Sequence, residues 1–185
     1  MRFPKLVVFD LDACLWSPEM FELSERPTSY DAKAGGVVAG RDVVKLFPGA
    51  LAVLRRLRSD PQLQEARVAV ASSTTEPAYA NRCLDVLWVD EAEGLTVGEM
   101  IHDADHRQIY PGNKGRQHFP ALQKASGVAF SDMMFFDDCT YGDNCGDVAS
   151  RCPGVTCVRT PEGMTEALFQ AGLDAFAAGK TGVVA

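Results

Sequence analysis

The 185-residue sequence has no apolar run that approaches the ~20 residues a membrane-spanning helix needs. The apolar stretch after Met1–Lys5 is short and ends at Asp10, so we expect no signal peptide and a cytoplasmic location. Basic residues are also scarce, because 18 Lys and Arg face 25 Asp and Glu, for a formal net charge of −7. A negative surface repels phosphate backbones and anionic lipids, so neither nucleic-acid nor membrane partners are expected.

The six cysteines include no C-x-x-C pair, and their gaps match no usual zinc-ligand spacing. The chain is also too long to depend on a disulfide scaffold. We therefore expect reduced thiols. With 46% hydrophobic and 23% charged residues, the composition is that of a globular protein, and the length suits one domain over residues 1–185 and a monomer.

Four short apolar runs have the pattern of strands buried on both faces, as in a parallel sheet. They cover Leu6–Phe9, Arg67–Ala71, Met133–Phe136 and Val155–Val158, with a weaker candidate at Gln108–Tyr110. Helical patterns lie between them, beginning near Pro48, Glu76, Lys114 and Thr165. This alternation predicts an α/β fold: a doubly wound, three-layer sandwich around a mainly parallel sheet.

Two segments fall outside this alternation. Residues 17–46 are rich in Pro and Gly and predict a loop with a small β-hairpin flap around Val37–Val44. Residues 181–185 are predicted to be a loose tail.

Three of the predicted strands end in polar residues: Asp10-Leu11-Asp12, Ser72-Ser73-Thr74 and Asp137-Asp138. The carboxyl ends of parallel strands meet at one edge of the sheet, where α/β proteins bind ligands. Carboxylates gathered there repel one another unless a cation joins them, and an all-oxygen ligand set suits Mg²⁺. Lys114 adds a positive charge that could hold a phosphate or a nucleophilic carboxylate.

These residues carry a resemblance to a known superfamily. VVFDLDACLW resembles the first motif of the haloacid dehalogenase superfamily, and RVAVAS, the Lys114 region IYPGNKGRQHF and FFDD resemble its second, third and fourth motifs. The stretch from Ile109 to Met164 is similar to the eukaryotic magnesium-dependent phosphatase family. The resemblance implies a Rossmann-like haloacid dehalogenase fold.

The resemblance also implies roles for the site residues. Asp10 would be the nucleophile that forms an aspartyl-phosphate, and Asp12 the general acid and base. Ser72 and Lys114 would bind the transferring phosphoryl group. Mg²⁺ would be held by Asp10, the backbone carbonyl of Asp12 and Asp138, with Asp137 as the alternative ligand or behind it.

Asp12 favours phosphate-ester hydrolysis over dehalogenation, because a halide leaves without a proton whereas an alkoxide or phenolate needs one. The gaps between the motifs leave no room for a cap domain, and an open site admits a phosphorylated protein or another bulky phosphate ester. The expected substrates are phosphotyrosine-type proteins or sugar phosphates. A nucleic-acid end phosphatase and a catalytically idle binding module are the alternatives.

Two residues depart from the family pattern, and others have two possible positions relative to the site. Cys14 stands where Thr is usual, and Ser73 stands where the relatives have Arg, so Ser73 is a candidate substrate contact. Trp16 and Phe21 are expected either at the substrate mouth or in core or rim packing. Asn144 or Asp143 could meet the outer ligand shell of the metal, but a plain turn is favoured there.

Overall fold

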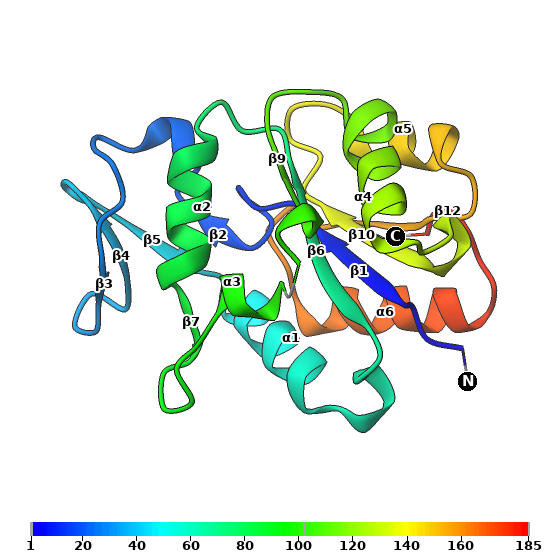
Figure 1. The fold of residues 1–185 in the computed structure, drawn as a ribbon, viewed down its shortest axis with the longest axis horizontal. Coiled ribbons are helices and arrows are strands. Elements are labelled where there is room, and N and C mark those ends of the chain that lie inside the picture. The colour runs from blue at the N-terminus through cyan, green and yellow to red at the C-terminus, as the bar shows by residue number, and fades with distance from the viewer. Residues whose placement is uncertain (1, 102, 185) are drawn as a thin grey trace.

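The centre of the molecule is a six-stranded sheet in which every strand is parallel to its neighbours. The computed structural model describes residues 2–101 and 103–184 and is drawn in Figure 1. The strand order is β12-β11-β10-β1-β6-β9. The strands are β1 (Leu6–Phe9), β6 (Arg67–Ser72), β9 (Arg107–Ile109), β10 (Met133–Asp137), β11 (Thr156–Arg159) and β12 (Gly182–Val183).

This strand order is that of a doubly wound sheet, since the chain starts at β1, moves out to β9 and then returns to β10 on the other side. The reversal places the topological switch point between β1 and β10. Phe9 pairs with Phe136 across this point, so Asp10 and Asp137 leave the sheet side by side. The predicted fold class is confirmed.

Helices cover both faces of the sheet because alternate strand residues point to opposite sides. Val7 and Phe9 face one core and Leu6 and Val8 the other. The first core is closed by α1 (Pro48–Ser59), α2 (Pro77–Val86), α3 (Val97–Met100) and α6 (Glu166–Ala177). The second is closed by α4 (Phe119–Ser126) and α5 (Asn144–Arg151), and Figure 1 shows α1 and α6 on the opposite side of the sheet from α4 and α5.

The predicted flap forms a separate antiparallel sheet of order β2-β5-β4-β3. Its hairpin turns at Gly40, whose φ of 63° is easy for glycine. Between Cys14 and β6, the chain forms only this sheet, α1 and two short 3₁₀ turns, which is too little for a cap domain. These elements are β2 (Trp16–Ser17), η1 (Met20–Glu22), β3 (Tyr30–Asp31), β4 (Gly36–Ala39), β5 (Asp42–Leu46) and η2 (Pro61–Leu63).

Several short elements were not apparent from the sequence because they are too brief to show a period. They are β7 (Trp88–Asp90), β8 (Leu95–Thr96), η3 (Ala104–His106), the π-helical turn η4 (Lys114–His118) and η5 (Phe130–Asp132).

The C-terminal segment corrects the expectation of a loose tail. Gly182 donates its N–H to the carbonyl of Val155 at 2.7 Å, and Val184 donates to that of Cys157 at 2.9 Å. The pair extends the sheet as β12, beside β11. β12 was not predicted because a strand of two residues, one of them glycine, is too short to show a hydrophobic pattern in the sequence. The last residue of the predicted tail, Ala185, lies outside the described residues.

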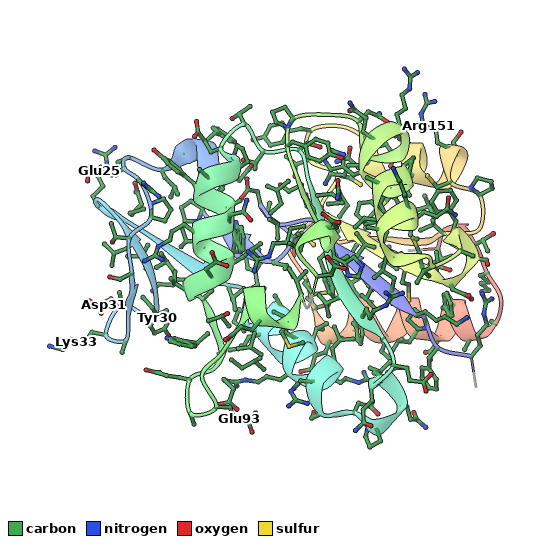
Figure 2. All side chains as sticks on the ribbon, in the orientation of Figure 1. Glu25, Tyr30, Asp31, Lys33, Glu93 and Arg151 are labelled. Carbon is green, nitrogen blue, oxygen red and sulfur yellow. The ribbon has the colours of Figure 1, made fainter. Side chains whose placement is uncertain are left out.

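Charged side chains project from the periphery of the molecule, as Figure 2 shows for Glu25, Lys33, Glu93 and Arg151. All six cysteines are free thiols, and all but Cys139 are buried. Among the described residues, no helix has the length and apolar character needed to cross a membrane.

An ion cluster joins the amino ends of the two central strands. Asp132, just before β10, contacts Arg2 and Lys5 at 3.0 Å each. Hydrogen bonds from Arg2 and Lys5 hold the pKa of Asp132 below its ordinary 3.8. This carboxylate therefore stabilises the fold at all pH values above 3.8, and the contribution is lost as the pH falls through the lowered pKa.

We expect Asp132→Asn to reduce the free energy of unfolding by about 0.5–1 kcal/mol at pH 7, the usual value for partly exposed ion pairs. The difference from the wild type should shrink as the pH is lowered from 7 to 3 in urea titrations. Glu65→Gln, which replaces an exposed carboxylate, is the control. A difference that stays constant with pH would show that the ion pairs are not its source.

Candidate active site

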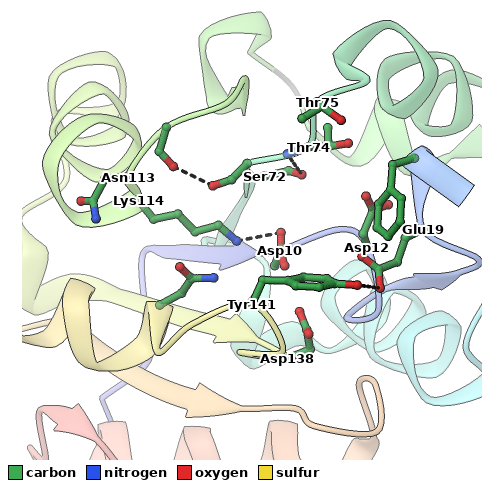
Figure 3. Close-up of a pocket in the computed structure, with 14 residues that line it drawn as sticks. Asp10, Asp12, Glu19, Ser72, Thr74, Thr75, Asn113, Lys114, Asp138 and Tyr141 are labelled. Atoms are coloured by element: carbon green, nitrogen blue, oxygen red, sulfur yellow. Dashed lines mark hydrogen bonds and ion pairs between the residues drawn. The ribbon is translucent and has the colours of Figure 1, made fainter.

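A cavity of about 720 Å³ opens at the carboxyl ends of β1, β6 and β10 (Figure 3). Three of the four motifs predicted from the sequence reach it from these strand ends, and the fourth reaches it from the start of η4. Its lining residues are Asp10, Asp12, Glu19, Phe21, Ser72, Ser73, Thr74, Thr75, Gly112, Asn113, Lys114, Asp138, Tyr141 and Asn144.

Lys114 is fully buried between two carboxylates. Its Nζ lies 2.8 Å from Asp10 Oδ1 and 2.5 Å from Asp137 Oδ2. Burial alone would lower the pKa of Lys114, but Asp10 and Asp137 outweigh it and raise that pKa, so the ammonium stays charged. Breaking such a buried pair leaves an uncompensated charge, which costs about 3–5 kcal/mol.

The turn that carries Lys114 is held by its neighbours. Asn113 caps it by accepting the N–H of Arg116 at 2.8 Å. Gly115 packs against α5 so closely that an added Cβ would lie 2.6 Å from Asp147 Oδ2. Only glycine fits there, and the Gly115 N–H donates to that same Asp147 oxygen at 3.1 Å.

Asp10 is 7% exposed at the end of β1, where its N–H donates to the carbonyl of Phe136 at 2.9 Å. Burial raises the pKa of Asp10 well above its usual range, and the charges of Asp137 and Asp138 raise it further, against the opposing effect of Lys114. A second cation beside Asp10 would restore the ionised form.

The three carboxylates of Asp10, Asp137 and Asp138 bring oxygens within 4.8 Å of one another. Lys114 is their only buried cationic contact among the described ion pairs, so with all three carboxylates ionised the group would carry a net charge of about −2. Hard oxygen donors with this charge fit a divalent cation such as Mg²⁺.

Asp137 and Asp138 have different surroundings. Asp137 is fully buried, and its oxygens accept from Lys114, the N–H of Cys139 at 2.8 Å and the amide of Asn144 at 3.0 Å. Asp138 is half-buried and lines the cavity, although one of its oxygens accepts the N–H of Thr140. This environment favours Asp138 as the direct metal ligand, with Asp137 behind it, and the assignment remains a proposal.

Asp12 stands beside Asp10 on the tight turn that follows β1. Its Oδ1 accepts from the indole Nε1 of Trp16 at 2.7 Å. Burial is the largest influence on Asp12 and raises the pKa of its carboxyl, while the Trp16 hydrogen bond opposes that rise. A carboxyl with a raised pKa is suited to donate a proton.

Ser72 and Ser73 form the opposite wall at the end of β6. Ser72 is almost fully buried, and its hydroxyl accepts the N–H of Thr74 at 3.4 Å. Ser73 lines the cavity but donates its hydroxyl to the carbonyl of Gly112 at 2.9 Å.

Trp16 is fully buried and does not line the cavity, which corrects its assignment as a substrate contact. The turn of residues 11–16 directs its ring inward, and it reaches the site only through its hydrogen bond to Asp12. Trp16 therefore positions the carboxyl group of Asp12.

Sequence reasoning also missed parts of the site. Asn144, expected in a plain turn, begins α5 and binds Asp137. The pair Asp143-Asn144 is followed by Gly146, whose N–H is capped by Asp143, and this capping pattern could have revealed the helix. Phe21 lines the mouth, which is one of its two expected positions, and Glu19 and Tyr141, which no motif marks, line it too. Cys14 is buried and accepts a hydrogen bond from Thr160, so it supports the turn.

The comparisons with known proteins agree with this geometry. Residues 2–179 match the family model described as Acid Phosphatase. The chain is 37% identical over 183 residues to Magnesium-dependent phosphatase 1 of Homo sapiens, covering 98% of this chain and 92% of that protein. It is 29% identical over 140 residues to a HAD-like hydrolase superfamily protein of Schizosaccharomyces pombe, covering 75% and 77% of the two chains.

Solved structures with similar folds are more distant in sequence. The phosphatase-containing N-terminal part of the Bacteroides fragilis protein BF1531, complexed with Mg, superposes with a TM-score of 0.56 at 18% identity over 87% of this chain and 37% of that one. CbbY of Rhodobacter sphaeroides, in complex with phosphate, has a TM-score of 0.55 at 13% identity over 93% and 100% of the two chains. At these identities the likeness supports the fold.

We expect Trp16→Phe to shift the alkaline limb of the kcat/KM profile of phosphate-ester hydrolysis to higher pH. The substitution keeps the ring and removes the hydrogen bond that lowers the pKa of Asp12, so the acid keeps its proton to higher pH. The comparison uses pH profiles of both proteins, with Trp88→Phe on β7 as the matched control. A limb that moves to lower pH, or an equal shift in the control, would contradict the role given to Trp16.

Proposed function

The chain belongs to the Acid Phosphatase family and is a phosphatase of the haloacid dehalogenase superfamily, and from that premise we propose that it hydrolyses phosphomonoesters with Mg²⁺ through an aspartyl-phosphate on Asp10. The observation that carries the proposal is the set of contacts around Asp10. Asp10 is a buried carboxylate that is paired with Lys114, lies within 4.8 Å of the cavity-lining Asp138 and stands beside Asp12. In the proposal, Asp10 is the nucleophile, Lys114 compensates its charge, and Asp12 is the acid.

In the first step, an Asp10 carboxylate oxygen attacks phosphorus, and the bond from phosphorus to the ester oxygen breaks. Asp12 donates its proton to the departing oxygen, which leaves as an alcohol or phenol. In the second step, Asp12 removes a proton from water as that water attacks the same phosphorus. The Asp10–phosphoryl bond breaks, inorganic phosphate leaves, and Asp10 and Asp12 return to their starting states.

The remaining residues hold the phosphoryl group. The Lys114 ammonium and the Ser72 hydroxyl face the cavity beside Asp10 and suit the negative oxygens of the transferring group. Mg²⁺ held by Asp10, Asp138 and the Asp12 carbonyl would supply further neutralisation of that charge. Ser73 contributes to the cavity wall near the substrate.

The substrate is proposed to be a phosphotyrosine-type protein or a small phosphate ester such as a sugar phosphate. Support comes from the mouth of the cavity, which no cap domain covers and which opens directly to solvent. The formal net charge of −7 disfavours nucleic-acid ends as substrates, because a negative protein repels a polyanion.

We expect hydrolysis of p-nitrophenyl phosphate in Mg²⁺, its loss in EDTA, and loss of at least ~10³-fold in Asp10→Asn, because an amide is a poor nucleophile toward phosphorus. Circular dichroism should show the variant folded, and Asp174→Asn, on the exposed face of α6, should behave like the wild type. Undiminished activity in EDTA or in Asp10→Asn would remove the proposed mechanism.

Asp12→Asn should impair breakdown of the intermediate more than its formation. A nitrophenolate leaves readily without a proton, but the attacking water still needs a base. Rapid mixing with p-nitrophenyl phosphate should give a burst of about one product per enzyme, followed by slow turnover. A steady rate without a burst, together with equal single-turnover losses on aryl and alkyl phosphates, would rule out Asp12 as the acid and base.

A further inference from the structure

The mouth of the cavity carries two aromatic rings that no step of the reaction uses. Phe21 is 56% exposed and Tyr141 is 73% exposed, and they are the large apolar side chains of the described chain that stand most clearly in solvent. Both line the catalytic cavity. Exposed rings at the entrance of a polar site are an observation that the proposed chemistry leaves unexplained.

The two rings come from segments far apart in the sequence and meet over the site. Phe21 lies on η1 beside the flap, whereas Tyr141 lies on the loop between β10 and α5. Their ring centroids are 6.2 Å apart at 76°, an edge-to-face contact. The Tyr141 hydroxyl donates to Glu19 Oε1 at 3.2 Å, and Figure 3 shows the Tyr141 ring lying across the cavity toward Glu19.

Some polar groups on the opposite wall are engaged by the protein itself. Ser73 donates to Gly112, the Thr74 hydroxyl accepts the N–H of Glu76, and the Asn113 side chain caps η4. A polyhydroxylated leaving group would have to share these groups with the protein. The two rings, in contrast, present aromatic surface to solvent.

Resting on the proposed function, we propose that Phe21 and Tyr141 determine its specificity by binding the ring of an aryl leaving group, and that Glu19 positions Tyr141 for this contact. With the phosphoryl group at Asp10, the leaving group extends toward the mouth, where the two rings lie. An aryl group placed there gains aromatic contact and removes both rings from water. The site is thereby assigned to aryl phosphates in preference to sugar phosphates.

The test measures the ratio of kcat/KM for aryl substrates to kcat/KM for alkyl substrates in each protein. The intrinsic reactivity of the leaving groups is the same for every variant, so it cancels when these ratios are compared. The aryl substrates are phenyl and 2-naphthyl phosphate, and the alkyl substrates are trifluoroethyl phosphate and glycerol 3-phosphate. Phe21→Leu and Tyr141→Leu should each lower the aryl-to-alkyl ratio roughly three- to tenfold, mainly through KM. Phe130→Leu, at the amino end of β10, should leave the ratio unchanged.

Tyr141→Phe separates the ring from its hydrogen bond. Tyr141→Phe keeps the aromatic surface and loses the contact with Glu19, so its loss should be smaller than that of Tyr141→Leu. Glu19→Ala, which removes the acceptor, should resemble Tyr141→Phe. An equal loss in Tyr141→Phe and Tyr141→Leu would overturn the role of the ring.

Three further outcomes decide the proposal. A ratio that does not change in either Leu variant, or that rises, overturns it, while continued hydrolysis of the alkyl substrates leaves the proposed phosphatase mechanism standing. The proposal is also overturned if the Leu variants change only the ratio of kcat/KM for phosphoethanolamine to kcat/KM for ethyl phosphate, because the mouth would then bind an ammonium group instead of an aryl ring. Failure of the wild type to hydrolyse any of these esters in Mg²⁺ would instead refute the proposed function.

Discussion

The arrangement of the site depends on one buried ammonium group. Lys114 lies between Asp10 and Asp137 and so ties the ends of β1 and β10 to the start of η4. Desolvating these charges costs several kcal/mol per ion, and the cost is offset only while the short contacts persist. Asp137 uses its remaining oxygen to hold Cys139 and Asn144, which leaves Asp138 at the cavity. Displacing Lys114 would therefore disturb Asp10, Asp137 and Asp138 together.

The main parallel strands and the polar residues at their ends were predictable from the sequence, because an apolar run that stops at a polar residue is a local signal. Asp10, Asp12, Ser72, Lys114 and Asp138 all line the cavity, as the motif pattern implied. The directions of Trp16 and Tyr141 were not predictable, because they depend on how the chain turns after each acidic pair. Both turns use left-handed residues without glycine, Ala13 at φ 58° and Cys139 at φ 59°.

Those two left-handed residues occupy equivalent places in the site. Each directly follows the second carboxylate of an acidic pair, Asp12 in one case and Asp138 in the other. A non-glycine residue in this conformation costs of order 1 kcal/mol and persists only where its surroundings hold it. Here the hydrogen bond from Ala13 to Trp16 and the one from Cys139 to Asp137 hold the two turns.

The short strand β12 has a consequence for solubility. A parallel sheet that ended at β11 would present the carbonyl groups of Val155 and Cys157 as open acceptors for another chain. The two residues of β12 occupy that edge and are themselves too short to recruit a further strand. Residues 182–184 thus protect this edge of the sheet against edge-to-edge aggregation, and a change that displaces them should reduce the yield of soluble protein before it affects the site.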